Sequence, residues 1–415
     1  MKEYDIVVVG GGSGGLAAAI EAKKNGVDSI LVIERELELG GILLQCIHNG
    51  FGLKIFKEEL TGPEYAERFI IELKEMGIEY KVGTLVTSIG KDKVLEYSNE
   101  EEGFVSIKAK AIIMTTGCYE RNAGAISIPG DRPSGVLTAG TAQKYINIDG
   151  YHVGRKVFIL GSGDIGLIMA RRLTLEGAKV LGVAEILPFS SGLTRNIVQC
   201  LDDYNIPLYL SHTVTNIVGK DKLRKIEISE VDGFTPIPGT EKEFEVDTLL
   251  LSIGLIPENN LIEQLGVAID QRTRGAIVSE SYMTNIDGIF AAGNALHVHD
   301  LVDFVTAESR RAGESASRYI KGNLDTEADL STTAGNGISY VVPQKINLKN
   351  ISNKLELFLR VKNVHKDARI KITSNGEIIK SVKRRHLAPA EMETISLKIS
   401  ELENVSDELR VELEG

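Results

Sequence analysis

The sequence has no tryptophan, only three cysteines and no long apolar run. The cysteines (Cys46, Cys118 and Cys200) are too few and too widely spaced for a disulfide framework, and they include no Cys-x-x-Cys pair. Such usage is typical of a reducing compartment, so we expect a cytoplasmic protein. No stretch of about 18 apolar residues occurs, which argues against a spanning helix and against direct membrane insertion.

The sequence also has fewer basic residues than acidic ones. Lysine and arginine total 47 against 58 aspartates and glutamates, which gives a formal net charge of −11. A protein that binds duplex nucleic acid needs a basic surface to neutralise phosphates, so this class is excluded. The chain of 415 residues, with 43% hydrophobic and 25% charged residues, is long enough for two or three domains with buried cores.

Two segments of the chain, residues 6–34 and 157–185, share one pattern. Each predicts a strand, a glycine turn, a helix and a second strand that ends in a carboxylate, Glu34 in the first and Glu185 in the second. The glycines of the two turns are Gly10, Gly12 and Gly15, then Gly161, Gly163 and Gly166. The pattern therefore indicates a duplicated domain type.

The glycine spacing suits the binding of a dinucleotide. The first glycine permits a tight turn, the second lets the backbone approach a pyrophosphate, and the third lets helix and strand pack closely. The N-terminus of the helix then faces the phosphates, and the carboxylate accepts hydrogen bonds from ribose hydroxyls. Glycine turns also cap helices for structural reasons alone, but here each motif has its strand, helix and carboxylate. The predicted binding residues of the two turns are Gly10, Gly12, Ser13, Gly14, Gly15, Glu34, Arg35 and Gly41, and Gly161, Gly163, Asp164, Ile165, Gly166 and Glu185.

The carboxylate of the second turn bears on the choice of nicotinamide cofactor. Glu185 would repel a 2′-phosphate, and no arginine follows immediately to accept one. NAD(H) is therefore favoured over NADP(H), although Arg195 is close enough in sequence to keep NADP(H) open.

The rest of the sequence predicts the remaining strands and helices and a further domain at the C-terminal end. Residues 80–110 alternate as an antiparallel meander would, residues 111–117 form a buried strand, and residues 302–320 form a long helix. From residue 338 the pattern is β, with Asn375-Gly376 as a hairpin turn. We expect an α/β protein with two Rossmann-like domains, the second inserted in the first, followed by a small C-terminal β-sandwich.

Four motifs in this order resemble the pyridine-nucleotide-disulfide oxidoreductase superfamily: the first glycine turn, Thr115-Thr116-Gly117, the second turn, and residues 288–294. The resemblance covers residues 1 to about 325. It implies an FAD-dependent NAD(P)H oxidoreductase that holds FAD in residues 1–120 and 281–325 and NAD(H) in residues 121–280. Residues 335–415, the C-terminal β domain that the strand pattern predicts, lie outside the resemblance. The flavin contacts that it implies beyond the first turn are Thr116, Gly117, Gly293, Asn294 and His299.

Two departures from that family matter. Asn294 stands where the family usually has an aspartate, and an amide can still bond a ribityl hydroxyl. Disulfide reductases of the family carry Cys-x4-Cys after a Gly-Gly pair, whereas here only Cys46 follows Gly40-Gly41, which excludes a dithiol relay. Cys46 could act alone through a sulfenic acid, as in some NADH oxidases and peroxidases, or could be a buried packing thiol.

Histidines near the flavin motifs are candidates for proton transfer. With Cys46, His48 is the candidate catalytic residue, and His297 and His299 could also bond the flavin or simply hold their loops. A metal site from His297, His299 and Asp300 lacks a further dependable ligand, so no metal is expected.

Residues 45–52, 60–66 and 294–303 resemble one branch more closely. That branch holds the FAD/NAD subunits of dye-linked proline dehydrogenase, sarcosine and opine oxidases, and proteins encoded with glycerol-3-phosphate dehydrogenase. The resemblance implies a second flavoprotein subunit and a small iron–sulfur component as partners. The chain would pass hydride between NAD(H) and FAD. The alternatives are a relay subunit without independent turnover, or a single-cysteine NADH oxidase or peroxidase. The C-terminal domain could dock a partner.

Overall fold

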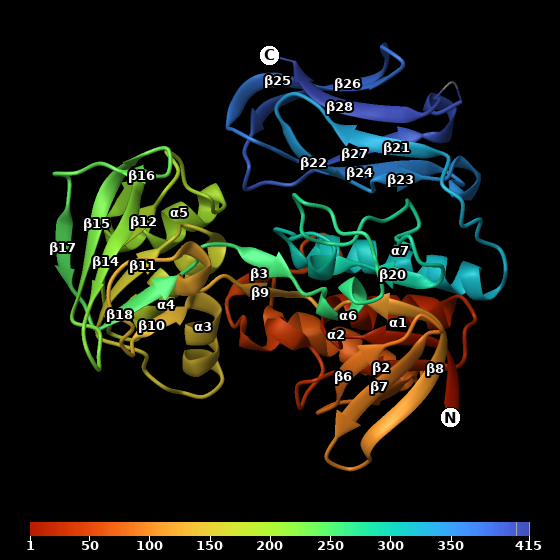
Figure 1. Ribbon diagram of the computed structural model, residues 1–415, viewed down its shortest axis with the longest axis horizontal. Coiled ribbons are helices and arrows are strands. Elements are labelled where there is room, and N and C mark those ends of the chain that lie inside the picture. The colour runs from red at the N-terminus through yellow and green to blue at the C-terminus, as the bar shows by residue number, and fades with distance from the viewer. Residues whose placement is uncertain (404, 415) are drawn as a thin grey trace. The chain divides into compact units, whose positions relative to one another are not determined.

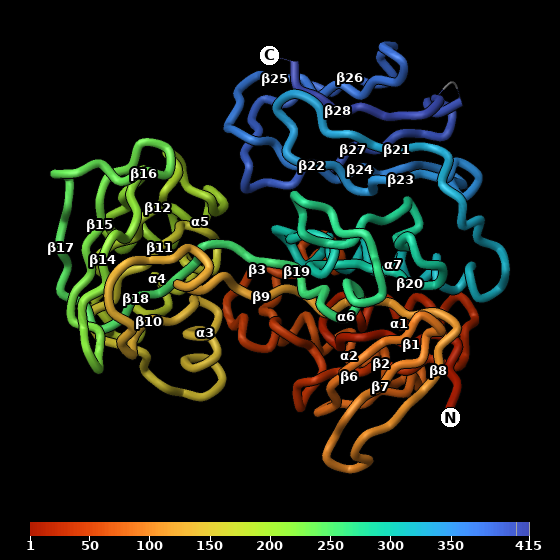
Figure 2. Tube along the Cα trace, in the orientation of Figure 1, coloured from red at the N-terminus to blue at the C-terminus, as the bar shows by residue number. Residues whose placement is uncertain are grey.

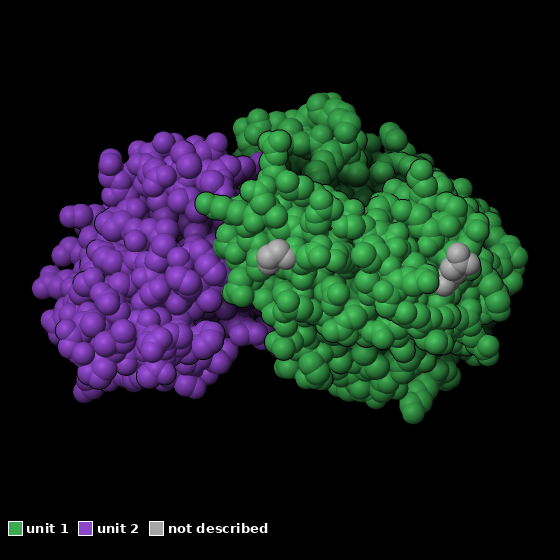
Figure 3. All heavy atoms as spheres, turned by 90° about the horizontal axis from the view of Figure 1, so that it is seen from above, with its two compact units in different colours: residues 1–118, 257–415 green, residues 119–256 purple. Residues whose placement is uncertain are grey.

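The computed structural model describes residues 1–403 and 405–414. The chain folds into two compact units, which Figure 3 shows in different colours. Unit 1 contains residues 1–118 and 257–415, and unit 2 contains residues 119–256. The chain crosses between them twice, through β9 (Cys118–Glu120) and β19 (Leu255–Pro257), which pair with each other.

Unit 1 is built on a mixed seven-stranded sheet in the order β5-β2-β1-β8-β7-β6, with β20 beside β8 (Figure 1). The central parallel strands of this sheet contain continuous runs of apolar residues, because both faces of the sheet are buried there. The strands are β1 (Lys2–Val9), β2 (Ile30–Ile33), β5 (Glu79–Lys81), β6 (Leu85–Ile89), β7 (Val94–Asn99), β8 (Gly103–Met114) and β20 (Ile289–Ala291). Strands β6, β7 and β8 form the predicted antiparallel meander, and β8 continues as the predicted buried strand.

Three helices accompany this sheet. They are α1 (Ser13–Lys24), α2 (Gly62–Glu75) and α7 (Val302–Ile320), and α7 has the predicted bounds. Helix α2 begins at a capping box in which Thr61 and Glu64 bond each other's backbone N–H. Shorter elements of unit 1 are β3 (Asn49–Phe51), β4 (Leu60–Thr61) and α6 (Asn260–Glu263).

Unit 2 repeats the parallel architecture of unit 1. Its five-stranded sheet has the order β10-β18-β11-β12-β13, and each neighbouring pair of strands is parallel. The elements are β10 (Val136–Thr138), α3 (Ala139–Asn147), β11 (Lys156–Leu160), α4 (Asp164–Leu175), β12 (Lys179–Glu185), α5 (Thr194–Cys200), β13 (Leu208–Leu210) and β18 (Thr248–Leu251). An antiparallel sheet adds β14 (His212–Val218), β15 (Lys225–Asp232), β16 (Thr235–Pro236) and β17 (Lys242–Glu245).

The C-terminal part of unit 1 is a β-sandwich, drawn in blue in Figure 2. One sheet has the order β23-β21-β28-β25-β26 and the other β22-β24-β27, and apolar residues of both form one core. The strands are β21 (Leu330–Ala334), β22 (Ile338–Val342), β23 (Lys345–Ile346), β24 (Lys354–Val361), β25 (His365–Ser374), β26 (Glu377–Leu387), β27 (Glu393–Lys398) and β28 (Glu408–Glu414). Asn375 and Gly376 both have positive φ in the two-residue loop between β25 and β26, so the predicted hairpin is confirmed.

Two boundaries differ from those that the sequence indicated. We expected the inserted domain to extend over 121–280, but residues 257–280 belong to unit 1. Apolar residues of this segment, including Ile262 and Val278, pack in the core of unit 1, and the buried amide of Asn259 donates a hydrogen bond to the carbonyl of Ala295. The sandwich also begins at Leu330 rather than at 335, since β21 pairs with β28.

Among the described residues, the structure contains no helix that is both long and apolar enough to cross a membrane.

Candidate functional site

The first glycine turn follows β1 and leaves no room for side chains at two positions. Gly10 has φ 107°, and a Cβ there would lie 2.3 Å from the carbonyl oxygen of Thr115. A Cβ at Gly15 would lie 1.8 Å from the carbonyl oxygen of Gly10. These two glycines therefore close the turn and bring α1 against the sheet, as the sequence predicted.

Gly12 differs from its neighbours because the space beside it is open. Its φ of −75° and ψ of −171° suit any residue, and it caps the N-terminus of α1. Within the described part of the chain, and leaving out its two neighbours, a Cβ there would meet only the Cα of Gly41 within 4 Å, at 3.9 Å. Gly12 also forms a parallel bridge with Gly40. The structure thus leaves space for a pyrophosphate at the N–H groups of α1, which is the fit that FAD requires.

The second turn, after β11, has the same construction. Gly161 has φ 98°, and a Cβ there would lie 2.0 Å from the carbonyl oxygen of Ser252. Gly163 caps α4 with a φ of −64°, and the nearest atom to a Cβ there is Ser252 Oγ at 3.3 Å. Gly166 packs against Gly161 and Ser252, where a Cβ would clash. Unit 2 therefore also presents an open helix N-terminus for a pyrophosphate.

The two carboxylates occupy equivalent positions in the two turns. Glu34 Oε2 accepts a hydrogen bond of 2.6 Å from the Gly11 N–H, and Glu185 Oε2 accepts one of 3.0 Å from the Ser162 N–H. Each bond spans 23 residues of sequence, and both glutamates are buried. Glu185 Oε2 also accepts from the hydroxyls of Ser162 and Ser191. The carboxylates thus hold the glycine loops, a role that the sequence motif did not indicate.

Other predicted binding residues lie around the two turns. Thr116 donates from its hydroxyl to the Glu258 carbonyl at 2.6 Å, and Gly117 accepts from the Glu258 N–H. Asp164 Oδ1 accepts from the Leu193 N–H and from the Asn196 amide, so it ties α4 to the loop before α5. Ser13 and Ile165 are half-buried and Arg35 is exposed.

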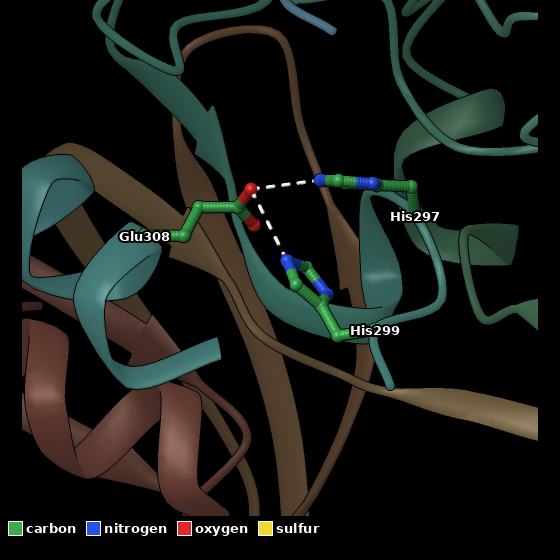
Figure 4. A group of neighbouring side chains, drawn as sticks. All are labelled: His297, His299 and Glu308. Atoms are coloured by element: carbon green, nitrogen blue, oxygen red, sulfur yellow. Dashed lines mark hydrogen bonds and ion pairs between the residues drawn. The ribbon is translucent and has the colours of Figure 1, made fainter. Parts of the chain in front are cut away.

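A buried group of two histidines and one glutamate lies after β20. Figure 4 shows His297 and His299 pointing toward the carboxylate of Glu308, which comes from α7. His297 Nε2 lies 2.8 Å and His299 Nε2 lies 3.4 Å from Glu308 Oε2, and all three side chains are fully buried. Glu308 Oε1 accepts a bond of 2.7 Å from the Gly293 N–H. This links the group to the predicted flavin-binding segment.

Burial and the neighbouring charges act in opposite directions on the ionisable groups of this cluster. Burial alone would raise the pKa of Glu308, but the charges of His299 and His297 and their hydrogen bonds hold that pKa far below its ordinary value. Burial lowers the pKa of His297, although Glu308 opposes the shift. Glu308 is therefore ionised, and its carboxylate accepts a hydrogen bond from the Gly293 N–H and lies against the two imidazoles.

The geometry fits a hydrogen-bonded group better than a metal centre. The three atoms that could serve as metal ligands, one from each side chain, lie within 4.8 Å of one another, so they could all approach one ion. However, ligands at about 2.1 Å from a tetrahedral zinc lie roughly 3.4 Å apart, whereas His297 Nε2 and Glu308 Oε2 are 2.8 Å apart. The three ligands considered from the sequence (His297, His299 and Asp300) do not come together. Asp300 forms an ion pair with Arg360, and the carboxylate beside the two histidines is that of Glu308. The absence of a metal stays a prediction that metal analysis would test.

Asn294 connects this group to the predicted flavin site. Its Oδ1 accepts from the His299 N–H at 3.0 Å and lies 3.3 Å from His299 Nδ1, while its amide lies 3.7 Å from Cys118 Sγ. The asparagine therefore orients His299. An amide oxygen can do this without adding a second negative charge beside Glu308.

The candidate catalytic residues Cys46 and His48 lie in the segment before β3. Cys46 donates to the Ile42 carbonyl at 3.3 Å, and burial raises the pKa of its thiol to about 12. A thiol with such a pKa is a poor nucleophile at neutral pH. His48 is half-buried, and its ring centroid lies 5.1 Å from that of Phe51, with the two ring planes tilted by 54°. All three cysteines lie in the described residues, and none of them forms a disulfide.

We expect Cys46→Ser to retain nearly all of the NADH-dependent flavin reduction and turnover, because its buried thiol is protonated at neutral pH. The measurement is steady-state turnover of wild type and variant with the same acceptor. A loss of about tenfold or more, with the flavin still bound, would instead support the single-cysteine oxidase or peroxidase.

A glycine turn with a buried carboxylate in each of two Rossmann-like units defines a protein that binds two dinucleotides. The family model of pyridine nucleotide-disulphide oxidoreductases matches residues 4–315, and the chain belongs to this family. The family uses FAD and NAD(P)H, and the chain is accordingly an FAD-dependent NAD(P)H oxidoreductase.

Comparison with individual proteins is consistent with this assignment. The chain is 28% identical over 339 residues to the thioredoxin reductase of Listeria monocytogenes, an alignment that covers 79% of this chain and 98% of that protein. The crystal structure of T. acidophilum thioredoxin reductase is similar with a TM-score of 0.62 and 23% identity, covering 76% of this chain and 98% of that one. The L-proline dehydrogenase of P. horikoshii is similar with a TM-score of 0.54 and 19% identity, covering 78% of this chain and 57% of that one. The two structural likenesses concern the fold alone.

Proposed function

We propose that this chain passes hydride between NAD(H) and FAD as one subunit of a multi-component dehydrogenase of amines or polyols. The flavin and the nicotinamide supply the redox chemistry when they are bound. The chain contributes the two glycine turns that hold the phosphates and the carboxylates that shape those turns. The positioning of the two cofactors then accounts for most of the catalysis.

The observation that carries the proposal is a complete pair of glycine turns in a chain without a dithiol. Cys46 is the only cysteine in the sequence that closely follows Gly40-Gly41, and desolvation raises the pKa of its thiol to about 12. Electrons from the flavin would therefore leave through a partner rather than through a disulfide of this chain. The similarity in fold to a proline dehydrogenase, and the resemblance of residues 294–303 to subunits of such enzymes, favour a second flavoprotein and an iron–sulfur component as that partner. A reducing cytoplasm suits three cysteines without a disulfide.

The subunit role is tested by purifying the chain from its native cells at low salt and assaying NAD⁺ reduction with proline, sarcosine and glycerol 3-phosphate in turn. We expect one substrate to support NAD⁺ reduction in the co-purified complex and none to do so with the isolated chain. Gly163→Val is the matched control, because it should assemble with the partner and fail to reduce NAD⁺. Oxidation of one of these substrates by the isolated chain would contradict the subunit role.

The buried carboxylate of Glu185 predicts a preference for NADH. A 2′-phosphate beside this carboxylate would be repelled, and the residues that follow it are Ile186, Leu187 and Pro188. We expect kcat/KM for NADH to exceed that for NADPH by about tenfold or more, which is about 1.4 kcal/mol. Anaerobic flavin reduction at a series of concentrations of each nucleotide measures the ratio. Equal constants would show that Glu185 does not face the ribose, with Arg195 as the next residue to examine.

A further inference from the structure

An arginine of the C-terminal β-sandwich contacts the segment that carries the buried histidines. Arg360, on β24, donates to the carbonyl oxygen of Val298 at 3.0 Å and forms an ion pair with the carboxylate of Asp300. The same guanidinium donates to the hydroxyl of Tyr340 at 3.1 Å. The ion pair is largely buried, with 16% of the arginine side chain and 10% of the aspartate side chain exposed.

Further groups of the sandwich hold the same segment. The other oxygen of Asp300 accepts from the Met392 N–H, just before β27, at 2.6 Å. The rings of Tyr340 and Phe358 lie 5.9 Å and 5.8 Å from the ring of His297. Residues 297–300 are therefore held by strands of the sandwich on one side and by Glu308 on the other.

These contacts come from a part of the chain that lies outside the family match. The family model ends at residue 315, and 79% of this chain aligns with 98% of the Listeria monocytogenes thioredoxin reductase. The sandwich is thus an addition to the shared fold. It contacts residues 297–300 of the same unit, which follow Gly293 and Asn294, where the resemblance to the family places the flavin.

We propose that the C-terminal sandwich is a fixed part of the flavin site and that Arg360 is its positioning residue. Arg360 holds residues 298–300, these hold His297 and His299 against Glu308, and the group in turn holds Asn294 and Gly293. The inference rests on the flavin-binding role of Asn294 within the proposed function.

Removal of Arg360 would leave the carboxylate of Asp300 buried without its cation. A buried charge that loses its partner is strongly unfavourable, so the segment would move until Asp300 reaches water. His299 would then lose its position against Asn294 and Glu308. Flavin affinity and the flavin spectrum should therefore change even though Arg360 is expected to touch no cofactor.

The test compares Arg360→Met with Arg384→Met in the full-length holoenzyme. Arg384 also forms a partly buried ion pair in the sandwich, with Glu393, and this pair joins β26 to β27. For Arg360→Met we expect the Kd for FAD to rise about tenfold or more and the visible absorbance band of the flavin to shift. Arg384→Met should keep both at the wild-type values. Circular dichroism checks the fold of each variant.

Wild-type FAD affinity and spectrum in a folded Arg360→Met variant would overturn the proposal, as would equal losses in the Arg384→Met variant. Arg360→Lys should lie between wild type and Arg360→Met, because it keeps the charge near Asp300 but lacks the planar guanidinium fork. FAD binding is measured without NADH, so its result is independent of whether hydride transfer occurs.

If Arg360→Met does not fold, Asp300→Asn decides the question in the same holoenzyme. This variant removes the charge of the ion pair with little change of shape. Amide hydrogen exchange of residues 296–301 should then accelerate about tenfold or more, while the strands of the sandwich keep their protection. Unchanged exchange in this segment, together with an unchanged flavin spectrum, would overturn the proposal.

Discussion

Gly163→Val is expected to leave the protein yellow and folded while it weakens NADH binding about a hundredfold or more. The backbone of Gly163 has dihedral angles that valine adopts readily, and the nearest atom to its Cβ is a serine hydroxyl at 3.3 Å. The side chain would fill the space at the N-terminus of α4 that a pyrophosphate needs. Loss of about two hydrogen bonds to phosphate, at about 1.5 kcal/mol or more each, corresponds to this factor.

The measurement for Gly163→Val is the NADH concentration that gives half-maximal rate of flavin reduction under anaerobic conditions. FAD content serves as the internal control, because the first glycine turn lies in the other unit and is unchanged. A variant that reduces its flavin at wild-type NADH concentrations would show that the Gly161–Gly166 turn does not hold the nicotinamide cofactor.

Gly12→Val is expected to yield a folded protein without bound FAD. Among the described residues, and apart from the chain neighbours of Gly12, the Cα of Gly41 at 3.9 Å is the only atom within 4 Å of a Cβ at Gly12, so the fold tolerates a side chain there. The same side chain would displace the FAD pyrophosphate from α1, again with a rise in Kd of about a hundredfold or more. The absorbance ratio of flavin to protein after desalting measures the loss.

Gly10 and Gly15 provide the contrast for Gly12. A Cβ at either would overlap backbone atoms at 2.3 Å or less, so Gly10→Val and Gly15→Val should impair folding itself. Thermal unfolding of the apoproteins separates the two effects. Gly12→Val with full FAD content, or with the same loss of folding as Gly15→Val, would contradict the assigned geometry.

The two glycine turns could be predicted from the sequence because their signal is local. Strand, turn, helix and carboxylate lie within about one supersecondary unit, and each glycine has a steric reason that spacing alone expresses. The structure places Gly10 and Gly15 as that reasoning required. The hairpin at Asn375-Gly376 was predictable for the same reason, since a two-residue turn needs positive φ.

Contacts between distant segments could not be read in this way. Glu308 lies within an amphipathic helix, and nothing in its own neighbourhood indicates that it would meet His297 and His299. Asp300 was grouped with those histidines because it is adjacent in sequence, yet its partner is Arg360, on a strand of the sandwich. Both pairings depend on tertiary structure.

The boundary of the inserted domain escaped prediction for a related reason. Residues 257–280 contain a short helix and turns, and their apolar side chains, such as those of Ile262 and Val278, pack in the core of unit 1. The buried amide of Asn259 also bonds the carbonyl of Ala295 in unit 1. Contacts of this kind depend on which distant segment lies beside the residue, so they leave no periodic signal in the sequence.

Anaerobic addition of NADH to the purified FAD-loaded protein tests the central claim most directly. If the chain passes hydride between nicotinamide and flavin, the yellow flavin absorbance will bleach, with one NADH consumed for each FAD. A flavin band that stays unchanged with excess NADH and with excess NADPH would contradict the account.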